Sequence, residues 1–190
     1  MTKSVAWALA LGGLLAGQRA WAEAPPANLV VWKLGSQFNL AAVLSHRSKD
    51  PKVTEQVYAK AKKLAQLAGV ELPKLPPKGD LPKLMGFLGK ENRTLAQKIA
   101  AKHGKKAATL FDMASMSMFL LLVYEFEDPN INKKFADGIT QRGKETGLPE
   151  KLWQPVVKLI QEKASFAKVR SAVLTMDDRV ADHLGAGKFK

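Results

Sequence analysis

Apolar residues recur along most of the chain at spacings of three and four positions, the period of one face of an α-helix. Val53, Val57, Ala61 and Leu64 form one such stripe. Few segments show the strict apolar–polar alternation of a half-buried strand. The pattern predicts an all-α protein, a compact bundle of about seven or eight helices. Short connections favour antiparallel packing between neighbours.

Capping residues mark the helix boundaries. Asp50-Pro51 is typical of an N-cap followed by proline at the first helical position, and Gly69 suits the left-handed residue after a helix end. Asp128-Pro129 repeats the first signal at a shift of 128 − 50 = 78 positions. Two interpretations stay open: an internal duplication with pseudo-repeats at 32–106 and 107–187, or two ordinary helix pairs with ordinary caps.

The remaining helices are placed by similar signals. Asp80, Thr94, Thr109 and Ser165 each precede an apolar periodic run and are predicted to begin a helix. A proline-rich segment, Glu71 to Gly79, is predicted to be an extended and fairly stiff connection. The helices predicted in this way lie at 34–46, 80–88, 94–103, 109–124, 152–160 and 165–184.

The N-terminal segment has the form of a secretory signal peptide. Lys3 is followed by an uncharged apolar run, Val5 to Gly17, and by Ala20-Trp21-Ala22, which places small residues at the two positions that a signal peptidase reads. We predict a signal peptide at 1–22, cleavage after Ala22, and a single all-α domain at 23–190. The alternative is an uncleaved anchor, but the apolar run is shorter than the roughly 20 residues that span a bilayer.

A second apolar run, Met113 to Tyr124, is also short for a membrane span, and we interpret it as a central buried helix. The mature protein is therefore expected to have no transmembrane segment and to be periplasmic or secreted.

Charge is the strongest distinctive signal. The chain has 190 residues, with 30 Lys and Arg, 17 Asp and Glu and a net charge of +13. Residues 49–106 carry 14 basic and 5 acidic side chains, whereas 107–190 carry 12 and 11. The absence of cysteine excludes disulfides, cysteine-ligated zinc and a cysteine nucleophile.

Six lysines are the candidate anion-binding residues. Such a surface attracts anionic polymers through its long-range field and through counterion release, although a merely solvated lysine face has the same composition. Lysine dominates over arginine and aromatic residues are not interleaved, which argues against specific nucleic-acid recognition. We therefore expect an anionic envelope component, such as lipopolysaccharide or a phospholipid head group, or an acidic partner protein. The candidates are Lys60, Lys63, Lys98, Lys102, Lys105 and Lys106.

Two other clusters carry alternative hypotheses. Met113, Met116 and Phe119 suggest a pocket for a small apolar ligand or a soft metal, against the alternative that flexible thioethers fill the core. Such a protein would be a carrier.

Asp178 and Asp182 lie four positions apart, with His183 beside them, and these residues are candidates for a cation site or for the active site of an unrecognised hydrolase. The alternative is a solvated face. No short catalytic, phosphate-binding or dinucleotide motif is present, and no cofactor is predicted. The favoured interpretation is an exported helical protein with a non-catalytic binding role.

Overall fold

The computed structural model describes residues 25–48, 50–75, 80–124 and 128–185, so the predicted signal peptide at 1–22 lies outside the described residues. The described residues form seven α-helices and no strand, which confirms the all-α prediction. The helices are α2 (Ala27–Arg47), α3 (Pro51–Leu67), α4 (Leu81–His103), α5 (Lys105–Val123), α6 (Pro129–Thr146), α7 (Glu150–Gln161) and α8 (Phe166–His183).

Three aspartates cap helices as predicted. The side chain of Asp50 accepts from the Lys52 backbone N–H, and that of Asp80 accepts from the Lys83 N–H. Asp128 caps α6 in the same manner. Each aspartate satisfies a donor that the first turn of a helix leaves without an intrahelical partner.

Four predicted boundaries are wrong: the helix end at 88 and the helix starts at 94, 109 and 34. The segments 80–88 and 94–103 belong to one helix, α4, because Thr94 donates its hydroxyl to the Lys90 carbonyl within the helix instead of capping a new one. Thr109 does the same inside α5, which begins four residues earlier, at Lys105. Helix α2 begins at Ala27, well before 34, because it is apolar on every side and no change of period marks its start.

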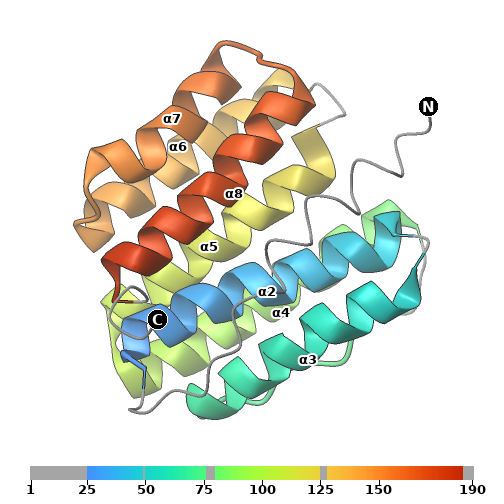
Figure 1. Ribbon diagram of the computed structural model, residues 1–190, viewed down its shortest axis with the longest axis vertical. Helices are drawn as coiled ribbons and strands as arrows, with labels where there is room; N and C mark the ends of the chain where they lie inside the picture. The colour runs from blue at the N-terminus through green and yellow to red at the C-terminus, as the bar shows by residue number, and fades with distance from the viewer. Residues whose placement is uncertain (1–24, 49, 76–79, 125–127, 186–190) are drawn as a thin grey trace.

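Helices α2 and α5 form the centre of the bundle, and both are buried over most of their length (Figure 1). Gly35 lies against Phe111 and Ser115, and twelve residues later Arg47 donates to the Leu122 carbonyl at 2.9 Å. Residue numbers rise together in both contacts, so the two central helices, which α3 and α4 separate in the sequence, run parallel.

Helices α3 and α4 cover one side of the central pair, and α6, α7 and α8 cover the other (Figure 1). Asn39 of α2 and Asn92 of α4 exchange two amide hydrogen bonds, at 3.1 and 2.8 Å, across the first side. Among the described residues one helix, α5, is long and apolar enough to cross a membrane, and 67% of that window is buried inside the protein. Such burial is typical of a core helix, as predicted for the run from Met113.

Candidate functional site

Three helix ends meet at one end of the bundle. His103 Nε2 lies 2.9 Å from the carbonyl oxygen of Ala68, and the Lys102 ammonium donates to the carbonyl of Gly69. The last turns of α3 and α4 are therefore in contact, and α5 begins at Lys105, with Gly104 alone between it and α4. Cations are favoured at helix C-termini, where carbonyl groups lack intrahelical partners.

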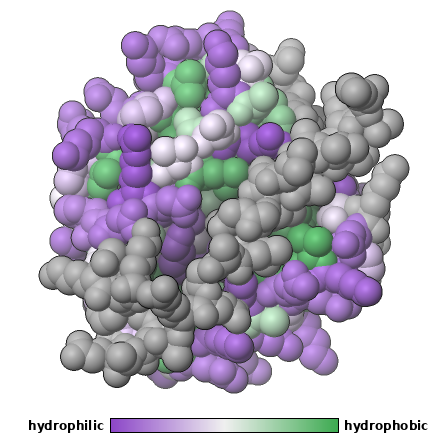
Figure 2. Space-filling view, in the orientation of Figure 1, coloured by the Kyte–Doolittle hydropathy of each residue, from purple (hydrophilic) through white to green (hydrophobic). Residues whose placement is uncertain are grey.

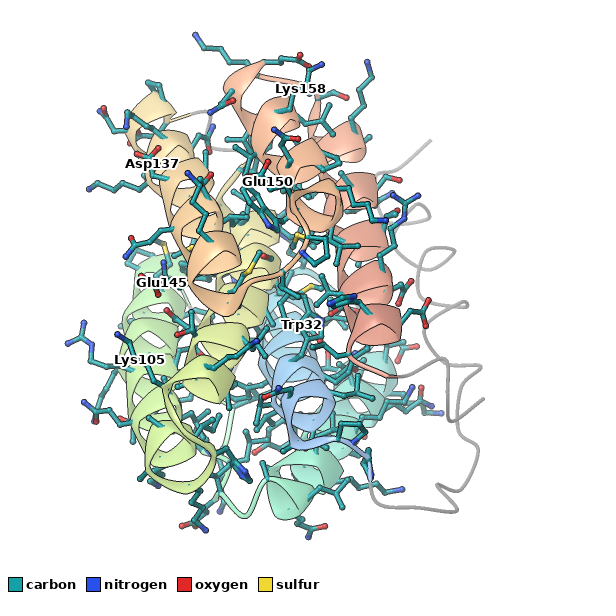
Figure 3. The ribbon with its side chains drawn as sticks, turned by 90° about the vertical axis from the view of Figure 1, so that its left-hand side faces the viewer. Trp32, Lys105, Asp137, Glu145, Glu150 and Lys158 are labelled. Atoms are coloured by element: carbon teal, nitrogen blue, oxygen red, sulfur yellow. The ribbon has the colours of Figure 1, made fainter. Side chains whose placement is uncertain are left out.

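Five exposed lysines lie within about two turns of this junction. None of them forms an ion pair with a carboxylate in the part of the chain that the structure describes. Figure 3 shows one of them, Lys105, at the outer edge of the bundle. We call these side chains the basic end: Lys63, Lys98, Lys102, Lys105 and Lys106.

The basic end is not a single helix face. Lys98, Lys102 and Lys105 lie four and three positions apart, a spacing that forms one stripe only on a continuous helix. Gly104 adopts a φ of 86° and separates α4 from α5. The lysines nevertheless come together, because the turn at Gly104 keeps the start of α5 beside the end of α4.

Lys60 differs in burial from the lysines of the basic end. It is half-buried, and burial together with the positive charge of Lys33 lowers its pKa from the usual 10.5. Lys60 was predicted with the other lysines, but it is less exposed than they are.

A cleft of about 360 Å³ adjoins the basic end, between α3, the connection at 70–75 and α4. The Tyr58 hydroxyl donates to the Pro73 carbonyl at 2.8 Å and holds the connection against α3, and burial raises the pKa of this phenol. The Lys62 ammonium lies 5.0 Å from the centre of the Tyr58 ring, a cation–π contact. Lys98 contributes to both the cleft and the basic end.

The cleft presents three flexible ammonium groups, from Lys62, Lys74 and Lys98, beside the carboxylates of Glu71 and Glu91. Compact ammonium groups on long stems suit phosphate oxygens, to which they present a point charge without fixed direction. The carboxylates reduce the net charge inside the cleft, so the stronger attraction for an anion lies at the basic end.

A buried carboxylate joins α8 to α2. Asp177 is 2% exposed and accepts from the Trp32 indole at 2.8 Å and from the Lys33 ammonium at 2.7 Å. Asp178 Oδ1 lies 3.6 Å from the same ammonium. Burial by itself lowers the pKa of Lys33, but the two carboxylates more than offset it, so the pKa is raised above 10.5. This cluster fastens α8 to the central helix.

This cluster was not predicted from the sequence, because the acidic residues considered on this segment were Asp178 and Asp182. The spacing from Val173 to Asp177 and Val180 places Asp177 on the apolar side of α8, and that was the available signal. Trp32 and Lys33 carry no signal of their own, because they fall at the start of a helix that has no polar face.

The candidate cation-binding residues are Asp178, Asp182 and His183. Asp178 is directed to Lys33 and is 68% exposed, and His183 is exposed at the end of α8. Within the described residues, no group of three or more His, Asp and Glu side chains is arranged to hold a metal ion.

The three residues of the predicted methionine pocket make packing contacts in the structure. Met113 is fully buried in the core, Met116 packs against Gly138 of α6, and the ring of Phe119 lies 5.9 Å from that of Phe135. Neither the cleft beside α3 nor the groove described next borders these residues.

A second concave region, a groove of about 380 Å³, runs between α7 and α8. Three α7 side chains and six α8 side chains line this groove, which no pattern in the sequence predicted. Figure 2 shows pale and green atoms among purple ones over these two helices. The lining residues are Leu152, Pro155, Leu159, Lys168, Ser171, Ala172, Thr175, Met176 and Arg179.

No known protein family, no curated protein and no solved structure matches this chain, so its function has to be inferred from its own residues.

Proposed function

We propose that this chain is an exported, non-catalytic binding protein whose basic end captures a phosphate-bearing component of the cell envelope. One observation supports the proposal above the others: five exposed lysines from three different helices gather at one end of the bundle without ion-pair partners in the described part of the chain. A merely solvated lysine face would need no such gathering.

The mechanism is electrostatic capture by a preformed surface. The ammonium groups of the basic end attract phosphate groups and release their counterions. The junction of α3, α4 and α5 keeps the lysines close together before binding. Binding therefore costs little backbone conformational entropy. Near a negatively charged membrane surface each lysine contributes about 1 kcal/mol.

The test measures sedimentation with vesicles. The protein is mixed with phosphatidylglycerol vesicles, phosphatidylcholine vesicles or lipopolysaccharide, at about 50 mM and about 200 mM salt. We expect binding to an anionic surface, with affinity falling steeply as salt rises. The two anionic samples distinguish phospholipid from lipopolysaccharide as the phosphate source.

A charge-reversal variant and a matched control locate the binding surface. The triple variant Lys63→Glu, Lys98→Glu, Lys105→Glu is expected to bind about 100-fold or more weakly, since three favourable charges become unfavourable. Lys134 and Lys144 on α6 and Lys151 on α7 are also exposed and lack ion pairs in the described part of the chain. A control variant in which those three lysines are replaced by glutamate has the same net charge as the triple variant at the basic end. Equal losses in both variants, or binding unaffected by salt, would contradict the proposal.

We also propose that α2–α3 and α5–α6 are related hairpins, the remnants of a duplication. The first helices begin at Ala27 and Lys105 and the second at Pro51 and Pro129, and both differences are 78 (105 − 27 and 129 − 51). This shift matches the one between the capping signals. An experimental structure in which the two hairpins superpose no better than unrelated helix pairs would contradict the proposed duplication.

A further inference from the structure

The groove between α7 and α8 has an apolar floor, whose side chains recur at three- and four-residue intervals along each helix. Leu152, Pro155 and Leu159 lie at positions i, i+3 and i+7 of α7, and Ala172 and Met176 lie one turn apart on α8. Parallel rows of this kind match the ridges of a further helix. The groove faces the outside of the bundle, because the buried side chains of α7 point toward α6 and the core.

Two cations lie along the α8 side of the groove. Lys168 and Arg179 are exposed, are 179 − 168 = 11 residues apart, and are therefore about 16 Å apart along the helix axis. The side chains lining the groove include no carboxylate, and neither cation forms an ion pair within the described residues. The hydroxyls of Ser171 and Thr175 lie between them. The groove is thus apolar along its floor and has one lining cation toward each end.

We propose that this groove binds an amphipathic α-helix of a partner protein, with a leucine-type apolar stripe and acidic residues spaced about three turns apart. Three turns of such a helix place one carboxylate at Lys168 and another at Arg179 while the stripe covers the floor. This partner is distinct from the phosphate-bearing component assigned to the basic end.

Other occupants fit the groove less well. A fatty acid has one carboxylate, so one of the two cations would stay unpaired, and its chain would lie in a groove open to water along its length. A second copy of this chain presents the same two cations and a net charge of +13. Charge complementarity therefore selects an acidic helix.

The test uses two labelled peptides and the full chain. Each peptide has the length of about five helical turns and the same leucine stripe. One carries glutamates eleven positions apart, and the other carries lysines there. Fluorescence anisotropy is expected to show binding of the glutamate peptide and at least about tenfold weaker binding of the lysine peptide.

Two variants act on the two features of the groove. The double variant Lys168→Glu, Arg179→Glu is expected to lose at least about tenfold in affinity for the glutamate peptide and to improve binding of the lysine peptide. Ala172→Trp fills the floor of the groove without changing its charge and is expected to weaken the binding of both peptides. Unchanged circular dichroism shows that each variant is folded.

Controls separate this inference from the basic end. Two double variants are compared: Lys134→Glu with Lys144→Glu on α6, and Lys63→Glu with Lys98→Glu at the basic end. Both are expected to leave peptide affinity within about twofold when the measurement is made at raised salt, which screens the change in net charge. If the basic-end variant instead abolishes peptide binding, or if Ala172→Trp has no effect, the groove is not the binding site. If oleate binds the groove and both peptides fail, the occupant is a lipid and the inference is wrong.

Discussion

The parallel crossing of α2 and α5 depends on the absence of a side chain at Gly35. A Cβ at this position would lie 2.5 Å from the Phe111 carbonyl oxygen, 3.0 Å from the Ser115 hydroxyl and 3.1 Å from the Ala114 Cβ. The nearest atom belongs to the backbone of α5, so no side-chain rotation relieves the clash. Gly35→Ala must therefore push the two central helices apart.

The expected cost comes from two opposing terms. Overpacking a buried contact costs about 1–3 kcal/mol, and a clash with backbone belongs at the upper end. Replacing glycine by alanine within a helix stabilises the helix by about 1 kcal/mol, because alanine has the higher helix propensity. Gly35→Ala is therefore expected to destabilise the protein by about 2 kcal/mol.

Gly86 is the matched control, because it also lies inside a helix but has no atom within 4 Å of an added Cβ. Gly86→Ala is expected to stabilise by up to about 1 kcal/mol, since only the propensity term acts. The two variants should then differ by about 3 kcal/mol, which corresponds to about 6–12 °C in melting temperature for a chain of this size.

Thermal unfolding followed by far-ultraviolet circular dichroism measures both variants under the same conditions. Equal melting temperatures for Gly35→Ala and Gly86→Ala, or a higher value for Gly35→Ala, would refute the close approach of the central helices.

Three further predictions concern the buried cluster and the N-terminus. Asp177→Asn leaves the Lys33 ammonium without its main partner and should cost about 3 kcal/mol in chemical denaturation, whereas Asp178→Asn should cost less than about 1 kcal/mol because its carboxylate is exposed. Because the pKa of Lys33 is raised above 10.5, the protonated group's contribution to stability is complete below that pH and is lost as the pH rises through the folded-state pKa. Alkaline titration of the melting temperature should show this loss, and Asp177→Asn should reduce it; an identical profile in both proteins would contradict the assignment. Mass spectrometry of the envelope-associated protein is expected to find Glu23 at the N-terminus, and an intact Ala22–Glu23 bond would exclude the predicted cleavage.

Local signals in the sequence were enough for the helical class and for several helix boundaries. The caps at Asp50, Asp80 and Asp128 could be predicted because a cap depends on atoms within three residues of itself. The start of α2 could not be predicted, because a helix surrounded by other helices has no polar face to define its limits.

The candidate site, like the fold, could be predicted from the sequence only in part. The excess of lysine between 49 and 106 could be counted from the sequence, but its gathering at one end depends on the contact of Lys102 and His103 with the end of α3. The groove between α7 and α8 could not be predicted, because its floor and its cations come from two helices whose relative position no local pattern encodes.

The sequence by itself determined the period, the caps and the charge of each segment, since these follow from the preferences of a residue and its near neighbours. The tertiary structure decided that α2 and α5 run parallel, that Asp177 is buried on Trp32 and Lys33, and which lysines share a surface. These properties depend on packing between residues more than 30 positions apart, where the free energy comes from the fit of whole helix faces.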